Sequence, residues 1–206
     1  MRVVVPFGTH DPKTRLSPIL AADERAAFAR VMLTDVLAAL AATDADPTVL
    51  ATGRLDIDVD VPVTVDDRPL TTAVNAAVAG APTPVAVVMA DLPLATPAAL
   101  SRLFATAGDV VLVPGRAGGT NAIVSRHPDF RTDYHGTSFL DHLAVARTID
   151  ASVGVVDSYR LSTDVDEPAD LVEVLLHGEG EAGVWLREHG VRIDRSGDRV
   201  GVARDD

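Results

Sequence analysis

The chain has 206 residues, of which 47% are hydrophobic, a formal net charge of -12 and no cysteine. This composition fits one globular domain and excludes a disordered chain, disulfides and thiolate metal sites. The negative charge argues against nucleic acid as a partner, because a phosphate backbone binds basic surface. The sequence shows no apolar run long enough to span a bilayer and no secretory signal, so we expect a cytoplasmic protein without a membrane partner.

The chain strongly favours one residue type for each sign of charge. Of the 18 cationic residues, Lys13 is the only lysine, and aspartate heavily outnumbers glutamate. An acidic, lysine-poor surface suits a protein that stays soluble in concentrated salt, where screening suppresses self-repulsion. Codon usage in a GC-rich genome is the alternative explanation. We expect salt adaptation.

Strands and helices alternate from the N-terminus onward. Apolar, valine-rich runs predict strands over residues 2–6, 47–51, 61–65, 85–89, 109–114, 120–125 and 152–157. Helical patterns between them predict helices over residues 23–42, 69–79, 97–106, 138–147 and 168–176. This alternation predicts an α/β fold in which helices cover a mostly parallel sheet.

The chain is expected to have a main part and a C-terminal extension. We expect residues 1–178 to form the main domain and residues 179–206 to extend it. The extension holds a short predicted helix over 181–189 and a hairpin with its turn at Ser196 and Gly197. It would either dock on the main domain or mediate self-association, as in a homodimer.

The first candidate site is the loop that follows the first strand and contains Lys13 and Arg15. In parallel sheets ligands bind beyond the carboxyl ends of strands, and two cations near a helix start suit a triphosphate. Phe7 and Pro12 exclude a Walker A loop, and the absence of GxGxxG counts against an NAD-dependent oxidoreductase. We expect Lys13 to lie in an exposed loop, so that its replacement leaves stability nearly unchanged.

Carboxylates supply the second candidate site. Asp91 directly follows the most apolar predicted strand, and Asp164 and Asp166 share one side of an extended segment. Proteins bind Mg²⁺ through one or two carboxylates together with substrate phosphates, so one of this pair could share a metal with Asp91. The alternatives are a cap at Asp91 and a helix start at Asp166 and Glu167.

Hydroxyl side chains beside glycines form the third candidate site. Thr120 follows a glycine pair, and Thr137 and Ser138 follow Gly136. Such positions bind phosphate or carboxylate without fixed charge, although ordinary turns and N-caps use the same residues. The histidines show no HxH or HExxH spacing, which disfavours zinc, and no serine lies in a GxSxG elbow.

Taken in order, these motifs resemble the 2-phospho-L-lactate guanylyltransferase (CofC) family over essentially the whole chain. The motifs that carry the resemblance are Lys13-Thr14-Arg15-Leu16-Ser17, Ala90-Asp91-Leu92-Pro93, Gly119-Thr120-Asn121-Ala122, Gly136-Thr137-Ser138-Phe139 and Thr163-Asp164-Val165-Asp166-Glu167-Pro168. The resemblance implies a three-layer α/β/α, Rossmann-like nucleotidyltransferase fold, shared with sugar-nucleotide and molybdopterin guanylyltransferases. The composition suggests a haloarchaeal member.

The resemblance also implies roles for individual residues. Lys13, Arg15 and Asp91 would be catalytic, and Asp91 with Asp164 or Asp166 would hold Mg²⁺. The residues implied to bind the nucleotide are Pro6, Phe7, Gly8, Lys13, Arg15 and Asn75, and those implied to bind the acceptor are Thr120, Thr137 and Ser138. Gly8 departs from the family, which often has a lysine there.

The implied reaction joins the guanylyl group of GTP to 2-phospho-L-lactate and releases pyrophosphate, in the synthesis of coenzyme F-420. Two alternatives stay open at this point. The acceptor could instead be phosphoenolpyruvate, 3-phosphoglycerate or a sugar phosphate. A non-catalytic nucleotide-binding module is the alternative from another class.

Overall fold

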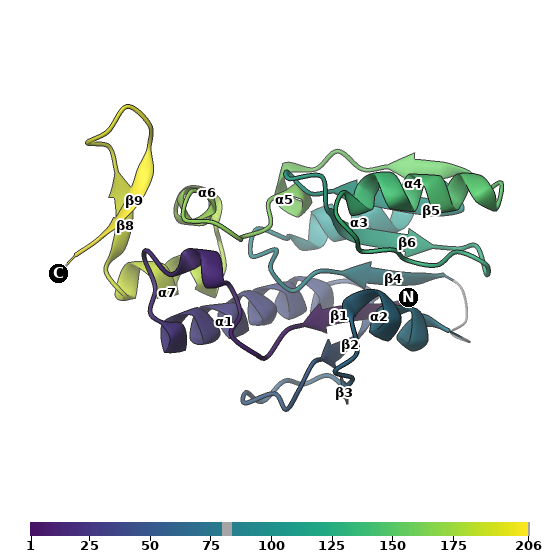
Figure 1. Ribbon diagram of the computed structural model, residues 1–206, viewed down its shortest axis with the longest axis horizontal. Coiled ribbons are helices and arrows are strands. Elements are labelled where there is room, and N and C mark those ends of the chain that lie inside the picture. Colours follow the sequence, from purple (N-terminus) through teal and green to yellow (C-terminus); the bar gives the residue numbers. More distant parts are fainter. Residues whose placement is uncertain (80–83, 206) are drawn as a thin grey trace.

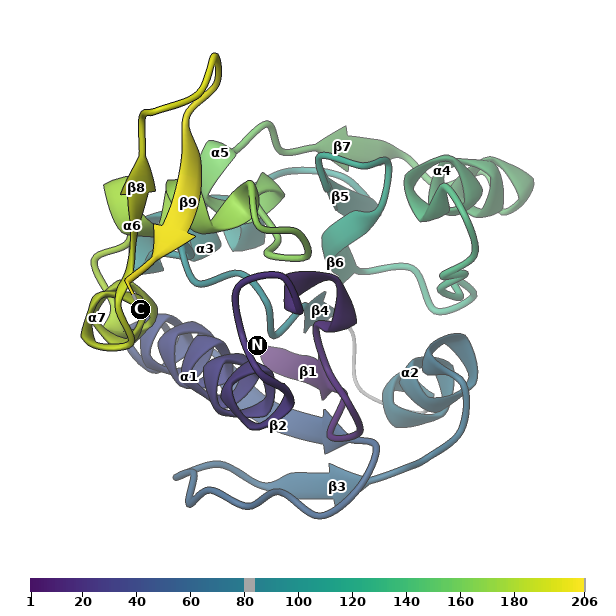
Figure 2. The same ribbon diagram turned by 60° about the vertical axis from the view of Figure 1, so that its left-hand side comes forward.

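The computed structural model describes residues 1–79 and 84–205, and a seven-stranded sheet runs through its centre. The strands lie in the order β3-β2-β1-β4-β6-β5-β7 (Figure 1; β7 is labelled in Figure 2). Their bounds are β1 (Arg2–Phe7), β2 (Asp46–Ala51), β3 (Val63–Val65), β4 (Val85–Val88), β5 (Val110–Pro114), β6 (Thr120–Ser125) and β7 (Val153–Val155). Each predicted strand of the main domain is therefore confirmed.

The sheet is parallel except at β6. β1 pairs in parallel with β2 and β4, β2 with β3, and β5 with β7. β6 is antiparallel to both β4 and β5, because the chain returns from β5 through the short turn around Gly118. A hairpin of this length joins only antiparallel strands.

Helices cover both faces of the sheet, which confirms the three layers (Figure 2). Buried side chains of α1 (Ala22–Ala41) and α3 (Pro97–Ala105) share one core cluster with one face of the sheet. Buried side chains of α2 (Leu70–Val78) and α4 (Ser138–Thr148) share a second cluster with the other face. Strands buried on both sides need continuous apolar runs, and the valine-rich sequence supplies them.

The C-terminal extension docks on the main domain. It comprises α7 (Glu181–Glu188) and a two-stranded hairpin of β8 (Val191–Asp194) and β9 (Gly201–Arg204), and it is described as far as residue 205. α7 lies against α1, and its first two backbone N–H groups, of Glu181 and Ala182, donate to the Asp35 carboxylate at 2.7 and 2.9 Å. The predicted hairpin is present, and the predicted turn residues Ser196 and Gly197 lie between its two strands.

Two short helices were not predicted, and one helix starts later than expected. The unpredicted elements are a 3-10 turn over Thr14–Leu16 and α5 (Tyr159–Ser162). α6 (Asp170–His177) begins two residues after the expected Pro168, because the Asp170 carboxylate accepts the backbone N–H groups of Asp166 and Glu167. Among the described residues, no helix is both long and apolar enough to cross a membrane.

Candidate active site

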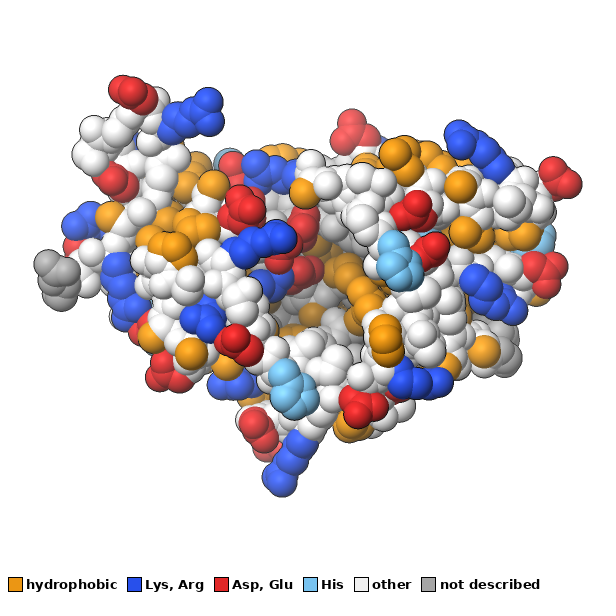
Figure 3. Space-filling model, viewed as in Figure 1, with side chains coloured by type: hydrophobic (Ala, Val, Ile, Leu, Met, Phe, Trp, Pro, Cys, Tyr) orange, Lys and Arg blue, Asp and Glu red, His pale blue; other side chains and the backbone are white. Residues whose placement is uncertain are grey.

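A pocket of about 530 Å³ lies across the carboxyl ends of β3, β2, β1 and β4. Figure 3 shows a hollow in the middle of this face, with apolar side chains in its wall and charged side chains along one edge. Residues that follow the four strands line the pocket: Asp66 and Arg68 after β3, Thr52 after β2, Gly8 after β1, and Met89, Ala90 and Asp91 after β4. This is the edge at which α/β sheets bind ligands.

The loop between β1 and α1 reaches over one end of the pocket in a strained conformation. Asp11 and Lys13 have positive φ values of 37° and 56°, which costs free energy for a residue with a Cβ. Arg25 of α1 holds this loop, since its guanidinium donates to the Asp11 carboxylate at 2.6 Å and to the Pro12 carbonyl at 3.4 Å. The loop is thereby held in the shape that aims Lys13 into the pocket.

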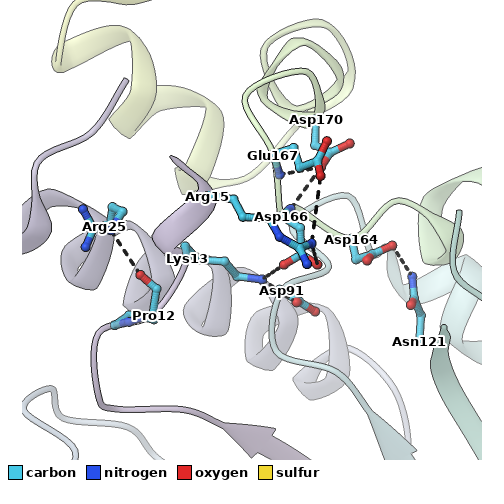
Figure 4. A network of polar contacts seen from close by, with 10 residues as sticks. All are labelled: Pro12, Lys13, Arg15, Arg25, Asp91, Asn121, Asp164, Asp166, Glu167 and Asp170. Atoms are coloured by element: carbon cyan, nitrogen blue, oxygen red, sulfur yellow. Dashed lines mark hydrogen bonds and ion pairs between the residues drawn. The ribbon is translucent and has the colours of Figure 1, made fainter. Parts of the chain in front are cut away.

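The Lys13 ammonium lies between two carboxylates from distant parts of the chain (Figure 4). Its Nζ donates to Asp91 Oδ2 at 2.6 Å and to Asp166 Oδ1 at 2.8 Å. The Lys13 side chain is only 12% exposed, so the expectation of an exposed loop residue was wrong. The loop folds back toward the sheet, and the two carboxylates draw the ammonium inward.

Electrostatics keep this ammonium charged. Burial lowers the pKa of Lys13, but the negative charges of Asp91 and Asp166 outweigh burial, and the pKa lies above its usual value. Arg15 stands farther out, with its guanidinium 3.8 Å from Asp166 and 3.9 Å from Glu167. The predicted cations and carboxylates therefore converge at one end of the pocket.

Asp91 presents a free oxygen there. Its Oδ2 accepts from Lys13, whereas its Oδ1 is buried and has no hydrogen-bond partner within the described part of the chain. A buried carboxylate oxygen without a partner is costly, and a bound cation would satisfy it. The Asp91 backbone carbonyl accepts the N–H of Val165 at 3.1 Å, which ties this strand end to the Asp164–Asp166 segment.

Asp164 is held by Asn121. The Asn121 side-chain amide donates to Asp164 Oδ1 and to the Leu161 carbonyl, both at 3.0 Å. Burial raises the pKa of Asp164, and the charges of Asp91 and Asp166 raise it further. Within residues 1–79 and 84–205, no three histidine, cysteine or acidic side chains are grouped closely enough to hold a metal by themselves, and Lys13 occupies the space between Asp91 and Asp166.

Sequence reasoning did not assign Asn121 or Arg25 to the site. Asn121 is part of the Gly119–Ala122 motif, and its position next to Thr120 at the start of β6 could have indicated a place near the site. A Cβ at Gly115 would lie 2.4 Å from Asn121 Oδ1, so glycine is required where that turn approaches the amide. Arg25 gave no signal, because an arginine in the first turns of a helix usually lies on the surface.

The other predicted residues lie apart from this cluster. Asn75 forms a pair of hydrogen bonds with the backbone of Thr132, at 2.9 and 2.8 Å, and is not among the residues that line the pocket. Thr120 is buried, and its hydroxyl contacts His142 Nδ1 at 2.9 Å and Ser138 Oγ at 3.4 Å. Thr137 precedes α4 but its side chain makes no cap hydrogen bond. Nucleotide binding by Asn75 and acceptor binding by these hydroxyls stay predictions.

Gly8 lies open in the pocket wall together with Pro6 and Phe7. A Cβ built at Gly8 would meet nothing within 4 Å. The position at which the resemblance implied a lysine therefore has room for a side chain, and the chain exposes its backbone there.

The structure fits the nucleotidyltransferase class that the motifs resemble. It has a mostly parallel sheet, a pocket across four strand ends, and a lysine among carboxylates at one end of that pocket. The fold is similar to that of a Desulfovibrio desulfuricans protein described as a candidate nucleotide-diphospho-sugar transferase, with a TM-score of 0.74 and 19% identity over 91% of this chain and 94% of that one. A transferase of undetermined role from Thermus thermophilus gives a TM-score of 0.56 at 17% identity, over 82% of this chain and 98% of that one.

The chain belongs to the family described as guanylyl transferase CofC like, whose profile matches residues 1–204. It is 65% identical over 204 residues to the 2-phospho-L-lactate guanylyltransferase of Halomicrobium mukohataei, which covers 99% of this chain and 100% of the relative. It is 59% identical over 208 residues to the protein of the same name from Haloferax volcanii, with 100% and 99% covered. The resemblance seen in the motifs is thus confirmed.

Proposed function

We propose that this chain transfers the guanylyl group of GTP to 2-phospho-L-lactate, giving lactyl-2-diphospho-5'-guanosine and pyrophosphate for coenzyme F-420 synthesis. The observation that carries the proposal is the meeting of Lys13, Asp91 and Asp166 at one end of the strand-end pocket. Family membership and the names of the close relatives supply the base and the acceptor. The proposal includes a cytoplasmic location, in keeping with a nucleotide substrate.

In this proposal the triphosphate lies at the Lys13 end of the pocket. Lys13 exchanges at least one of its carboxylate partners for phosphate oxygens, and Arg15, which is 68% exposed, turns inward to join it. An ammonium suits this exchange because it is a compact charge that bonds from several directions. Both cations would then lie close to the phosphorus atoms at which charge changes during transfer.

The transfer itself needs no general base. An oxygen of the acceptor phosphate attacks the α-phosphorus of GTP in line, a new P–O bond forms, and the bond to the bridging oxygen of the leaving pyrophosphate breaks. The acceptor phosphate is largely doubly ionised at neutral pH, since its second pKa is about 6. Positioning and charge neutralisation by Lys13 and Arg15 therefore carry the catalysis.

A divalent cation, Mg²⁺ in our proposal, fits the acidic residues at this end. Asp91 would hold it through the buried oxygen that lacks a partner, together with Asp164 or Asp166. When bound, such an ion neutralises charge on the phosphates and favours departure of pyrophosphate. Asn121 fixes the Asp164 carboxylate in place for this role.

We assign the acceptor to the hydroxyl group cluster of Thr120, Thr137 and Ser138. Thr120 and Ser138 are buried next to His142, and the two segments that carry them meet where the Phe139 N–H donates to the Gly118 carbonyl at 3.2 Å. Hydroxyl and backbone N–H groups near a helix start bind phosphate or carboxylate. This assignment rests on the family resemblance and on that juxtaposition.

The proposal is tested by pyrophosphate release in molar KCl with Mg²⁺. Each of GTP, ATP, CTP and UTP is combined with 2-phospholactate, phosphoenolpyruvate and 3-phosphoglycerate. We expect the highest kcat/KM for GTP with 2-phospholactate. Asp91→Asn should lower turnover by about two orders of magnitude or more with an unchanged fold. The enzyme proposal fails if no pair releases pyrophosphate.

A further inference from the structure

The pocket has a second end, beyond β2 and β3, that differs from the Lys13 end. Its walls are apolar and come from Leu50 of β2 and from Leu70 and Ala73 of α2. The charged residues at this end are Asp66 and Arg68. A mostly apolar pocket with a few placed polar groups is the usual form of a small-molecule recognition site.

The two ends are separated by the width of several strands. Asp66 follows β3 and Asp91 follows β4, and β2 and β1 lie between them in the sheet. Neighbouring strands lie about 4.8 Å apart, so three intervals place the two carboxylates on the order of 14 Å apart. A nucleotide whose phosphates lie near Lys13 would therefore direct its base toward Asp66.

The backbone of Asp66 is fixed at the end of β3, and its carboxylate is ionised in contact with Arg68. Its backbone N–H donates to the Ala51 carbonyl at 2.9 Å, which fixes its place at the end of β3. Arg68 donates to it from Nε, from Nη2 and from the backbone N–H. These side-chain and backbone hydrogen bonds from Arg68 lower the pKa of Asp66 to about 2.

We propose that Asp66 is the residue that selects guanine, by accepting hydrogen bonds from the N1–H and the 2-amino group of the base. This inference rests on the proposed function and names the group that would read its nucleotide. The two oxygens of a carboxylate accept two donors that lie side by side. Among the common bases, guanine alone presents two such donors next to each other on its Watson–Crick edge, whereas adenine presents an unprotonated N1 there.

The contacts with Arg68 show how the carboxylate receives such an edge. Arg68 Nε and Nη2 are two parallel donors, and in the free protein they occupy both oxygens of Asp66. The Arg68 side chain is 51% exposed whereas that of Asp66 is 15% exposed, so the guanidinium can swing out while the carboxylate stays. Solvent screens the half-exposed guanidinium, which lowers the free-energy cost of exchanging it for a base.

Nucleotide binding with Mg²⁺ in molar KCl, measured by calorimetry, tests the inference without the acceptor. Wild-type protein should bind GTP at least about tenfold more tightly than ITP, which lacks the 2-amino group, and should bind ATP more weakly still. Asp66→Asn should lose about tenfold or more in GTP affinity and gain as much for XTP. The amide can donate to the xanthine 2-oxygen, which a carboxylate repels.

Asp67→Asn is the matched control, because this neighbouring carboxylate is exposed and does not line the pocket. It should leave all four affinities unchanged. The inference is overturned if Asp66→Asn keeps the wild-type order of GTP and XTP. If that variant fails to fold, equal binding of GTP and ITP by the wild type overturns it. Selective GTP binding without pyrophosphate release would instead sink the proposed function and leave Asp66 in its role, and failure to bind any nucleotide would sink both.

Discussion

Lys13 combines a strained backbone with a buried charge. Its φ of 56° lies in the left-handed region, and its ammonium is held between Asp91 and Asp166. A strained backbone conformation that is kept in the folded protein indicates that the site needs the side chain in that place. Here the strain at Lys13 places one compact cation between the carboxylates. The other cationic residues of the chain are arginines, and we expect a planar guanidinium to fit less well than an ammonium between the two carboxylates.

Replacement of Lys13 should therefore affect both activity and stability. Lys13→Arg should lower kcat/KM for GTP by about tenfold, equal to about 1.4 kcal/mol, and Lys13→Gln should lower it further. Lys13→Gln should also lower the free energy of unfolding by about 1–2 kcal/mol, because Asp91 loses its partner. Steady-state kinetics and urea melts check this, with the highly exposed Arg54→Gln as control. Unchanged values for Lys13→Gln would contradict it.

His142 should make stability depend on pH. Its ring is buried, and Nε2 accepts the Asp133 N–H while Nδ1 faces Thr120. Burial lowers its pKa from 6.5 to about 4 in the folded state. At pH values between these two pKa values, His142 is protonated in the unfolded chain but not in the folded chain. The free energy of unfolding therefore has its full value above pH 6.5 and falls by about 3 kcal/mol toward pH 4.

His142→Gln should remove that acid-dependent loss while keeping an acceptor for Asp133. Urea melts of both proteins at several pH values between 4 and 7 measure the difference. His135→Gln is the control with the opposite sign, because the hydrogen bond that the His135 ring donates to the Asp133 carboxylate raises the pKa of the exposed His135. Parallel curves for wild type and His142→Gln would rule the assignment out.

At the scale of elements, one aspartate joins the extension to the main domain. Asp35 of α1 accepts the first two N–H groups of α7, and its own burial raises its pKa. A Cβ at Gly180 would lie 2.4 Å from Asp35 Oδ1, so the approach needs glycine. α7 thus receives its helix cap from a residue about 150 positions earlier in the chain, as the 146- and 147-residue separations show.

Asp35→Ala should cost about 1–2 kcal/mol, the value of a lost helix cap. Hydrogen exchange should increase first in α7 and the β8–β9 hairpin, because their attachment weakens before the sheet opens. Asp44→Ala, which replaces an exposed aspartate just after the C-terminal end of α1, is the control. A loss of protection spread evenly over the molecule would argue against a local anchor.

Sequence periodicity predicts the helices and strands whose formation depends on their own residues. β1, β4 and α1 follow from apolar runs and from Glu24, whose side chain accepts the Ala21 N–H at the helix start. α5 has four residues and no period to detect. The start of α6 depends on the Asp170 side chain, and the antiparallel direction of β6 depends on a turn length.

The same distinction holds for the candidate site. Lys13 and Asp91 were predicted to lie near each other because strand ends share one edge of a sheet, and Asp164 or Asp166 was expected to share a metal with Asp91. The observed contacts of Lys13 join residues 78 and 153 positions apart. The burial of Lys13 and the support from Asn121 come from packing between distant segments. No local pattern reports such packing, so these features required the structure.

For the whole molecule, the net charge of -12 predicts stabilisation by salt. Self-repulsion favours expansion at low ionic strength, and the Debye length falls from about 10 Å at 0.1 M to about 3 Å at 1 M. The close relatives come from Halomicrobium and Haloferax species. Tm should therefore rise steadily from dilute buffer to molar KCl. A flat or falling Tm would contradict salt adaptation.

Molar KCl poses a separate difficulty for the Lys13 end of the pocket. Two carboxylates facing one another would attract any dissolved cation, and potassium would be the most abundant. The ammonium of Lys13 is attached to the chain, so its effective concentration at Asp91 and Asp166 is set by the loop and does not change with the medium. We therefore expect this built-in cation to compete with dissolved potassium for the Asp91 and Asp166 carboxylates at any salt concentration.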